Sequence, residues 1–309
     1  MKQSKRLSGI FLNRKMKVLK DWMLPIAMIT GALTYQWIAR ISFLTPYLIF
    51  AMLLVTFSKI SWKDIRFHPA HIWLLLIQLV GCAIAYFVFR PFNETLAQGA
   101  LLCLLAPTAS AAAVITGMLG GNVGFLTAYT LFCNIAIAVA APVYFSLVGA
   151  HDEIFFLQSV WYIFKRVFPL LVLPLFIAIA LRKWIPKAHK ALIQIPQLSF
   201  YLWAIALTIV TGVTVQFVLN NESPDYKTEI GLAIIALILC CLQFVAGWQI
   251  GRRYGDRISS GQGLGQKNTV LAIWMAQTFL HPLVSIAPAA YILWQNIINS
   301  YQIWRKNRS

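Results

Sequence analysis

Apolar residues run through this chain in long blocks from Trp22 to Trp304, and short polar or charged segments separate the blocks. A helix of about 20 apolar residues crosses the roughly 30 Å core of a bilayer. The pattern predicts an all-α polytopic membrane protein, with residues 1–21 as a basic cytoplasmic tail and residues 22–309 as one transmembrane unit. The predicted spans number ten, near residues 22–39, 41–60, 71–89, 96–119, 123–148, 160–181, 197–219, 229–251, 258–280 and 282–304.

The ninth predicted span begins with an unusually polar stretch, Ser259 to Thr269, which contains three glycines and Lys267. One interpretation makes this stretch a cytoplasmic loop. However, Thr269 to Trp304 is 36 residues, roughly 54 Å of helix at 1.5 Å per residue, which is too long for one span. Two spans fit only if the first begins before Lys267. Polar, helix-breaking backbone at membrane depth is tolerated only where it is buried in protein or lines a watery cavity.

A second interruption lies in the fourth span, where Pro107 removes a backbone hydrogen bond and small residues surround it. Taken alone, Pro107 is equally well explained as a structural kink. The two interruptions, however, fall in the fourth and ninth of ten spans, at similar depths from opposite faces. This arrangement predicts two five-span repeats of inverted topology with a binding site near the membrane midplane.

Other polar side chains also fall within apolar runs. In the fifth span Thr127, Thr130 and Asn134 share one helical face, and Gln78 lies midway along the third span. The tenth span holds Ser285, Gln295, Asn296 and Asn299. Each of these, taken singly, is more often an interhelical hydrogen bond than a ligand contact.

Charge supports the membrane assignment and its orientation. The chain is 60% hydrophobic and 11% charged, whereas soluble domains carry about 25% charged residues. The net charge of +17 does not indicate nucleic-acid binding, because the basic residues lie between apolar runs. With both termini cytoplasmic, twenty of the 25 basic residues other than Lys267 lie inside, as the positive-inside rule requires. We expect a multi-pass protein of the cell (cytoplasmic or inner) membrane, with the lipid bilayer as a partner and a monomeric state.

Several chemistries have no support in the sequence. All nine carboxylates lie at span ends or in loops, so no acidic relay is expected inside the membrane. No histidine or cysteine spacing suits a metal, and the five cysteines are expected to be reduced core residues. No catalytic constellation and no phosphate-binding loop appear. We therefore expect no enzymatic activity and no cofactor.

Three segments together resemble the bile acid:sodium symporter family. They are PTASAAAVIT at 107–116 followed by GNV at 121–123, GQKNTVLA at 265–272, and WQN at 294–296. The resemblance extends to the number and order of spans. It implies a core domain of spans 3–5 and 8–10 in which the broken fourth and ninth helices cross. It also implies a panel domain of spans 1, 2, 6 and 7, with substrate between the two domains and alternating access.

The chain departs from this family at the sodium sites. A Ser-Asn pair of the fourth helix appears as Ala112 and Ala113, and a fifth-helix serine appears as Leu126. The ninth-helix glutamate falls at Gly263 and the glutamine before the asparagine falls at Lys267, while Gln78 and Thr130 look retained. Na⁺ stays a possible coupling ion, but most of its side-chain ligands are missing and a lysine has been added.

These observations predict a secondary active transporter of a small organic anion, because helix N-termini at the breaks and the Lys267 charge favour anions. The alternatives are a sodium-independent or proton-linked exporter of another solute, and a membrane sensor or scaffold that does not transport. The predicted substrate-binding residues are Lys267, Asn268, Thr269, Gln266, Pro107, Thr108, Ser110 and Asn296. The residues predicted for ion coupling, more doubtfully, are Gln78, Thr130 and Gln262.

The topology gives the first test. Single cysteines introduced at Asn221 and Ser309 should react differently with an impermeant thiol reagent added to intact cells, because they lie on opposite sides of the membrane. We expect labelling at Asn221 and protection at Ser309. Labelling of Ser309 from outside would contradict the ten-span arrangement.

Overall fold

The computed structural model describes residues 23–60, 65–149, 155–195, 197–220, 225–306 and 308, and these residues form helices without a β-strand. The predicted basic tail, residues 1–21, lies outside them. The α-helices are α2 (Met23–Leu33), α3 (Tyr35–Ile38), α4 (Thr45–Ser58), α5 (Pro69–Phe89), α6 (Glu94–Leu105), α7 (Ala112–Leu119), α8 (Val123–Val148), α9 (Phe156–Trp184), α10 (Pro186–Ile193), α11 (Leu198–Leu219), α12 (Tyr226–Tyr254), α13 (Arg257–Gly265), α14 (Thr269–Phe279) and α15 (Ile286–Lys306). Two 3-10 helices are η1 (Ala39–Leu44) and η2 (Pro282–Ser285).

Among the residues that the structure describes, six helical segments are long and apolar enough to cross a membrane: Tyr35–Ser58, α5, α8, α9, α11 and α12. The four remaining predicted spans have other structures. The fourth and ninth are each broken into two helices, α6 with α7 and α13 with α14. The tenth begins with η2 and continues as the more polar α15. The first ends early, because α2 stops at Leu33.

One detail of the predicted spans is wrong. The boundary between the first two spans was placed at residue 40, whereas the chain turns after Leu33 and passes through α3 and η1 before α4 begins at Thr45. Apolar residues continue through this turn, so hydropathy alone gave no boundary. The connection after the sixth span contains a helix, α10.

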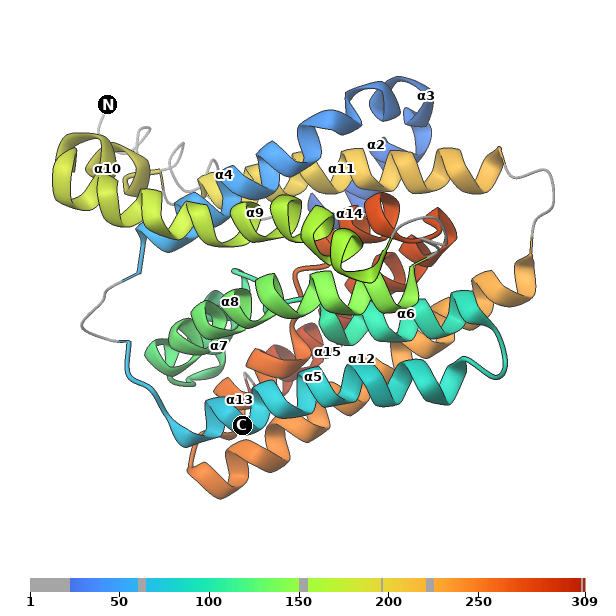
Figure 1. The fold of residues 1–309 in the computed structure, drawn as a ribbon. Helices are drawn as coiled ribbons and strands as arrows, with labels where there is room; N and C mark the ends of the chain where they lie inside the picture. Colours follow the sequence, from blue (N-terminus) through green and yellow to red (C-terminus); the bar gives the residue numbers. More distant parts are fainter. Residues whose placement is uncertain are drawn as a thin grey trace, which may run out of the picture.

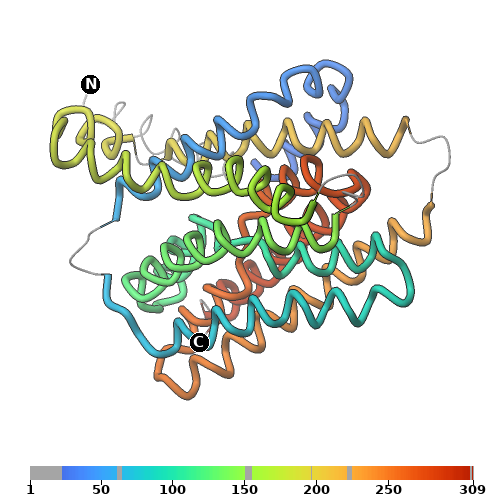
Figure 2. The backbone as a smooth tube through the Cα atoms, in the orientation of Figure 1, coloured from blue at the N-terminus to red at the C-terminus, as the bar shows by residue number. Residues whose placement is uncertain are grey.

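The helices lie in two groups, which Figures 1 and 2 show as an upper and a lower layer. The upper group contains α2, α3, α4, α9, α10 and α11, in which α11 packs on α2 and α4, and α4 packs on α9. The lower group contains α5 to α8, α12, α13 and α15. The groups meet through α8 and α9, and α14 packs against α4 and α11 of the upper group as well as α6 and α15 of the lower one.

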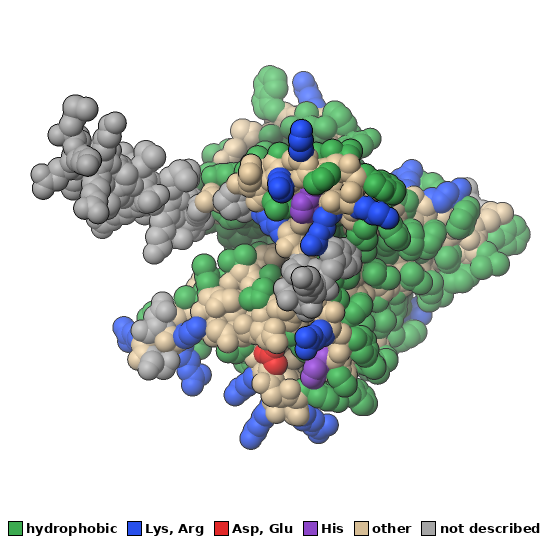
Figure 3. Space-filling view, turned by 90° about the vertical axis from the view of Figure 1, so that its left-hand side faces the viewer, with side chains coloured by type: hydrophobic (Ala, Val, Ile, Leu, Met, Phe, Trp, Pro, Cys, Tyr) green, Lys and Arg blue, Asp and Glu red, His purple; other side chains and the backbone are tan. Residues whose placement is uncertain are grey.

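Basic side chains gather at one end of the molecule. Figure 3 views this end, where Lys and Arg side chains appear on both groups of helices. The ends of α9 and α12 and the last turn of α15 contribute Arg182, Lys183, Arg252, Arg253 and Arg305.

Two glycines of α12 allow α13 to pack directly on its backbone. A Cβ atom on Gly247 would lie 2.5 Å from the Ser260 carbonyl oxygen, and one on Gly251 would lie 2.3 Å from that of Asp256. Small residues four apart permit this close approach between helices in a membrane. The polar first half of the broken ninth helix is thereby held against α12.

Substitution of Gly247 tests this contact. Gly247→Ala should lower the thermal stability of the detergent-solubilised protein, because the added methyl group meets backbone and overpacking costs roughly 1–3 kcal/mol. The matched control is Gly231→Ala in the same helix, whose Cβ would meet only the flexible end of Leu96 at 3.0 Å. Equal melting temperatures for the two variants would contradict the proposed packing.

Candidate functional site

The fourth predicted span breaks at Pro107. Ala106 leaves the helix with φ −50° and ψ 130°, an extended conformation that proline favours in the residue before it. The helix resumes as α7 at Ala112, and no side chain caps its first turn. Ser110 is half-buried and Ala111 is exposed at this helix start. The second half of the broken helix therefore begins inside the span without a side-chain cap.

The ninth predicted span breaks in the same way without a proline. α13 ends at Gly265, Gln266 is extended, and α14 starts at Thr269. The side chain of Asn268 caps α14 by accepting a hydrogen bond from the Leu271 N–H at 3.3 Å. Unlike the start of α7, this helix start is both capped and buried.

The two breaks cross and pair through their backbones, forming the segment that we call the crossing (residues 106–111 and 266–268). The Asn268 N–H donates to the Pro107 carbonyl at 2.7 Å, and the Ala109 N–H donates to the Gln266 carbonyl at 3.0 Å. These bonds make Thr108 and Lys267 an antiparallel bridge. The two broken helices thus meet at an isolated antiparallel β-bridge.

The side chains of Thr108 and Lys267 each donate a hydrogen bond to the other broken helix. The Thr108 hydroxyl donates to the carbonyl of Gly263 at 2.7 Å, and the Lys267 ammonium donates to the carbonyl of Leu104 at 3.1 Å. Gly263 lies four residues before Lys267, and Leu104 lies four residues before Thr108. In unbroken helices, the backbone N–H of Lys267 would serve the Gly263 carbonyl and that of Thr108 would serve the Leu104 carbonyl. The side chain of the other residue replaces each of these donors.

The end of α6 shows why such donors are needed. The last four carbonyls of a helix have no intrahelical partner, and Pro107 has no N–H to offer the carbonyl of Cys103. Side chains satisfy all four groups. Gln243 of α12 donates to Cys103 at 3.3 Å, Lys267 donates to Leu104, and Gln78 of α5 donates to Leu105 and Ala106 at 3.4 and 3.0 Å.

Each of these two glutamines is held by a buried tyrosine. The Tyr129 hydroxyl donates to the side-chain oxygen of Gln78 at 3.0 Å. Gln243 donates to the Tyr291 hydroxyl at 2.9 Å, and Tyr291 donates in turn to the Gly265 carbonyl at 2.8 Å. The network therefore reaches both broken helices from α5, α8, α12 and α15.

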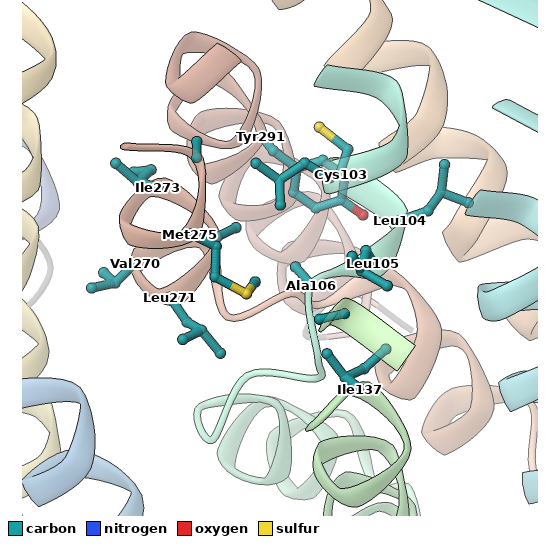
Figure 4. Close-up of a cluster of buried hydrophobic side chains, with 14 of the residues drawn as sticks. Cys103, Leu104, Leu105, Ala106, Ile137, Val270, Leu271, Ile273, Met275 and Tyr291 are labelled. Atoms are coloured by element: carbon teal, nitrogen blue, oxygen red, sulfur yellow. The ribbon is translucent and has the colours of Figure 1, made fainter. Parts of the chain in front are cut away.

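Lys267 lies in the middle of this network with 1% of its surface exposed. Gln295 of α15 holds its backbone, accepting from the Lys267 N–H at 2.9 Å and donating to its carbonyl at 3.4 Å. The ammonium meets the C-terminal end of α6, which carries partial negative charge. Figure 4 shows a cluster of buried side chains from the end of α6 and from α14, with Ile137 of α8 and Tyr291 of α15.

The structure brings most of the predicted substrate-binding residues together. Pro107, Thr108, Gln266, Lys267 and Asn268 form the crossing, Thr269 follows it as the first residue of α14, and Ser110 precedes α7. Asn296 does not join them, because its side chain donates to the Ile292 carbonyl of its own helix at 2.6 Å. Its neighbour Gln295 makes the contact with Lys267 instead.

The three residues predicted for ion coupling have different hydrogen-bond partners. Gln78 contacts the end of α6, whereas the Thr130 hydroxyl donates to the Leu126 carbonyl within α8 at 2.9 Å. Gln262 donates toward α15, to Asn299 at 3.1 Å and Gln302 at 3.0 Å. In the described part of the chain, no group of three or more His, Cys, Asp or Glu side chains is arranged to hold a metal ion.

Sequence reasoning missed Gln243, Tyr129 and Tyr291 as members of the site. Gln243 is a single amide inside a long apolar run, which is the same signal that marked Gln78. Tyrosine in an apolar helix carries no comparable signal, because its ring packs like any aromatic core residue.

A sequence profile of the sodium bile acid symporter family matches residues 10–221. The chain belongs to this family. The match covers the helices from α2 to α11 and includes Gln78 and Pro107, but it ends before the helices that carry Gln243 and Lys267. The family is one of membrane transporters, so the six long apolar helices are those of a multi-pass transport protein. No curated protein matches the chain at a significant level.

A double-mutant cycle tests the account of the break. Gln243→Leu should destabilise the protein by roughly 1–3 kcal/mol, because the Cys103 carbonyl stays buried without a donor. Pro107→Ala restores an N–H at the position that normally serves this carbonyl. The cost of Gln243→Leu should therefore be smaller in the Pro107→Ala background.

The matched control for this cycle is Gln98→Leu. Gln98 is a buried α6 glutamine that donates to the Val148 carbonyl at 2.8 Å, away from the break. Its cost should be the same with and without Pro107. If Gln243→Leu were equally costly in both backgrounds, the missing proline N–H would not explain the Gln243 contact. Thermal unfolding in one detergent gives all the values needed.

Proposed function

We propose that this symporter-family member is a secondary active transporter of a small organic anion that works by alternating access without sodium. The arrangement proposed is two inverted five-span repeats in a monomer of the cell membrane, with both termini cytoplasmic. The upper helix group would act as the panel and the lower group, with α14, as the core. The observation that carries the proposal is the crossing, in which Lys267 occupies the carbonyl end of α6.

The reciprocal contacts at the crossing support the inverted repeats. A two-fold operation that exchanges Thr108 and Lys267 also exchanges the two backbone bonds and the two side-chain bonds. A glutamine and tyrosine pair also occurs in each half of the chain, Gln78 with Tyr129 on α5 and α8 and Gln243 with Tyr291 on α12 and α15, although both glutamines donate to the end of α6. Repeats of this kind place their substrate near the midplane, at the broken helices.

The start of α7 is the proposed site of the anion. No side chain caps its first turn, Ala111 is exposed there, and of its first N–H groups those of Ala112 and Val114 donate to the nearby carbonyls of Ala109 and Ala111. A helix N-terminus has a partial positive charge and free N–H groups, so it favours a carboxylate or a similar anion. The start of α14 is a poorer candidate, because Asn268 caps it and its residues are buried.

Lys267 supports sodium-independent transport. Unwound carbonyls and the C-terminal ends of broken helices are the groups that coordinate cations in transporters of this architecture. Here an ammonium group already donates to such a carbonyl. A lysine at the bilayer centre costs roughly 2.5–3.5 kcal/mol on insertion scales, so its placement needs compensation, and the α6 end provides it. Lys267 either remains charged throughout the cycle or takes up a proton when the anion binds, and both states make sodium dispensable.

Two other functions remain as outcomes of the test. A proton-linked exporter of a different solute would show pH-driven flux with no preference for anions. A sensor or scaffold would bind a ligand or partner without moving solute. Membership of a transporter family favours transport over the sensor.

Flux measurements test the proposal. Ligands are first selected by thermal shift from bile acids and smaller carboxylates, and uptake of a radiolabelled hit into proteoliposomes is then measured. Replacing sodium by choline should leave uptake unchanged, whereas Lys267→Met should abolish it, because the α6 carbonyls lose their cation. Lys227→Met, at the exposed start of α12, is the matched control and should transport normally. A steep sodium requirement in the wild type would overturn this role of Lys267.

A further inference from the structure

The connection after α9 forms a basic and apolar surface that the transport cycle does not use. It consists of Arg182, Lys183, Trp184, Ile185, Lys187 and Lys190, which we call the α10 surface. All six residues are exposed, and Trp184 and Ile185 expose 73% and 54% of their surfaces. Figure 3 shows Lys and Arg side chains gathered at this end of the molecule, with those of the upper helix group above.

This surface is fixed to the upper helix group. A His189 ring nitrogen lies 2.9 Å from the carbonyl oxygen of Ser58, at the end of α4. The Arg182 guanidinium donates to the carbonyl of Ile60 at 3.4 Å, just beyond the same helix. Carbonyls at a helix end lack intrahelical partners, so these bonds satisfy groups that α4 leaves open. A ligand held by α10 is therefore held by α4 and α9 as well.

The charge of this region has one sign. The sequence from Ile154 to Asn221 contains no aspartate or glutamate, so the basic side chains of the α10 surface have no acidic neighbour along the chain. Trp184 and Ile185 lie between the lysines, immediately after a helix long and apolar enough to cross the membrane. Tryptophan beside lysine at the end of such a helix is the pattern of a membrane interface.

We infer that the α10 surface binds the headgroups of anionic phospholipids in the leaflet at this end of the molecule, with Trp184 and Ile185 inserted beside them. An acidic soluble partner would be attracted by the lysines but would leave two large apolar side chains unexplained. A neutral bilayer surface would accommodate the apolar side chains but not the uninterrupted positive charge. Anionic lipid satisfies both features. Binding would set the depth of α4 and α9 in the membrane.

Selective quenching by brominated lipids tests this inference. A bimane fluorophore is attached at Ala188→Cys, an exposed position of α10, in a Cys241→Ala background, since Cys241 is the exposed cysteine of the described residues. The full-length protein is placed in nanodiscs of equal parts phosphatidylcholine and phosphatidylglycerol, with bromine on one lipid or the other. Each lysine near an anionic surface favours anionic lipid about fivefold, so brominated phosphatidylglycerol should quench more strongly. High salt should weaken this preference.

Two triple variants make the test specific. Lys183→Gln, Lys187→Gln and Lys190→Gln together should make the two brominated lipids quench equally. Arg252→Gln, Arg253→Gln and Arg305→Gln remove the same charge from the lower helix group and should leave the preference intact. The inference is overturned if the two brominated lipids quench the wild-type protein equally, as expected if the surface binds an acidic protein partner. It is also overturned if the triple lysine variant is still quenched more strongly by brominated phosphatidylglycerol. Neither result depends on whether the protein transports an anion.

Discussion

The carbonyl groups of Cys103 to Ala106 lie buried at the end of α6, and each requires a donor that its own helix does not supply. Leaving one of them unpaired would cost roughly 1–3 kcal/mol, and more in a membrane, where no water can substitute. Three side chains from three other segments provide these donors. This need constrains the positions of α5, α12 and the second broken helix. Each must bring one long polar side chain to the carbonyls at the end of α6.

This requirement also explains why the site is shared between distant parts of the chain. Gln78 and Pro107 lie in the segment that the family profile matches, whereas Gln243 and Lys267 lie beyond it. The donors and the carbonyls they serve are separated by 27 to 163 residues. Neither half of the chain could bury its broken helix alone, because half of the polar groups would remain without partners.

The sequence predicted those features of the site that a single segment encodes. Pro107 and the glycine-rich stretch before Lys267 break their helices locally. Their matching depth predicted a midplane site, and the family resemblance implied that the two helices cross. The partners could not be predicted, because Gln243 and Tyr291 belong to helices whose rotation depends on packing. Asn296 and Gln295 illustrate the limit: both are amides on α15, and only the helix orientation selects Gln295 for Lys267. The turn between α2 and α4 escaped prediction because its residues are as apolar as the helices around it.

Two backbone hydrogen bonds, between Pro107 and Asn268 and between Ala109 and Gln266, link the two broken helices directly. With the exchanged side chains of Thr108 and Lys267, they join four half-helices at one point. Separating one half-helix from the others would leave carbonyls of both broken helices without donors. In the transport cycle proposed above, the joint would therefore shift as one unit, and the solute would pass beside it, along the boundary with the other helix group.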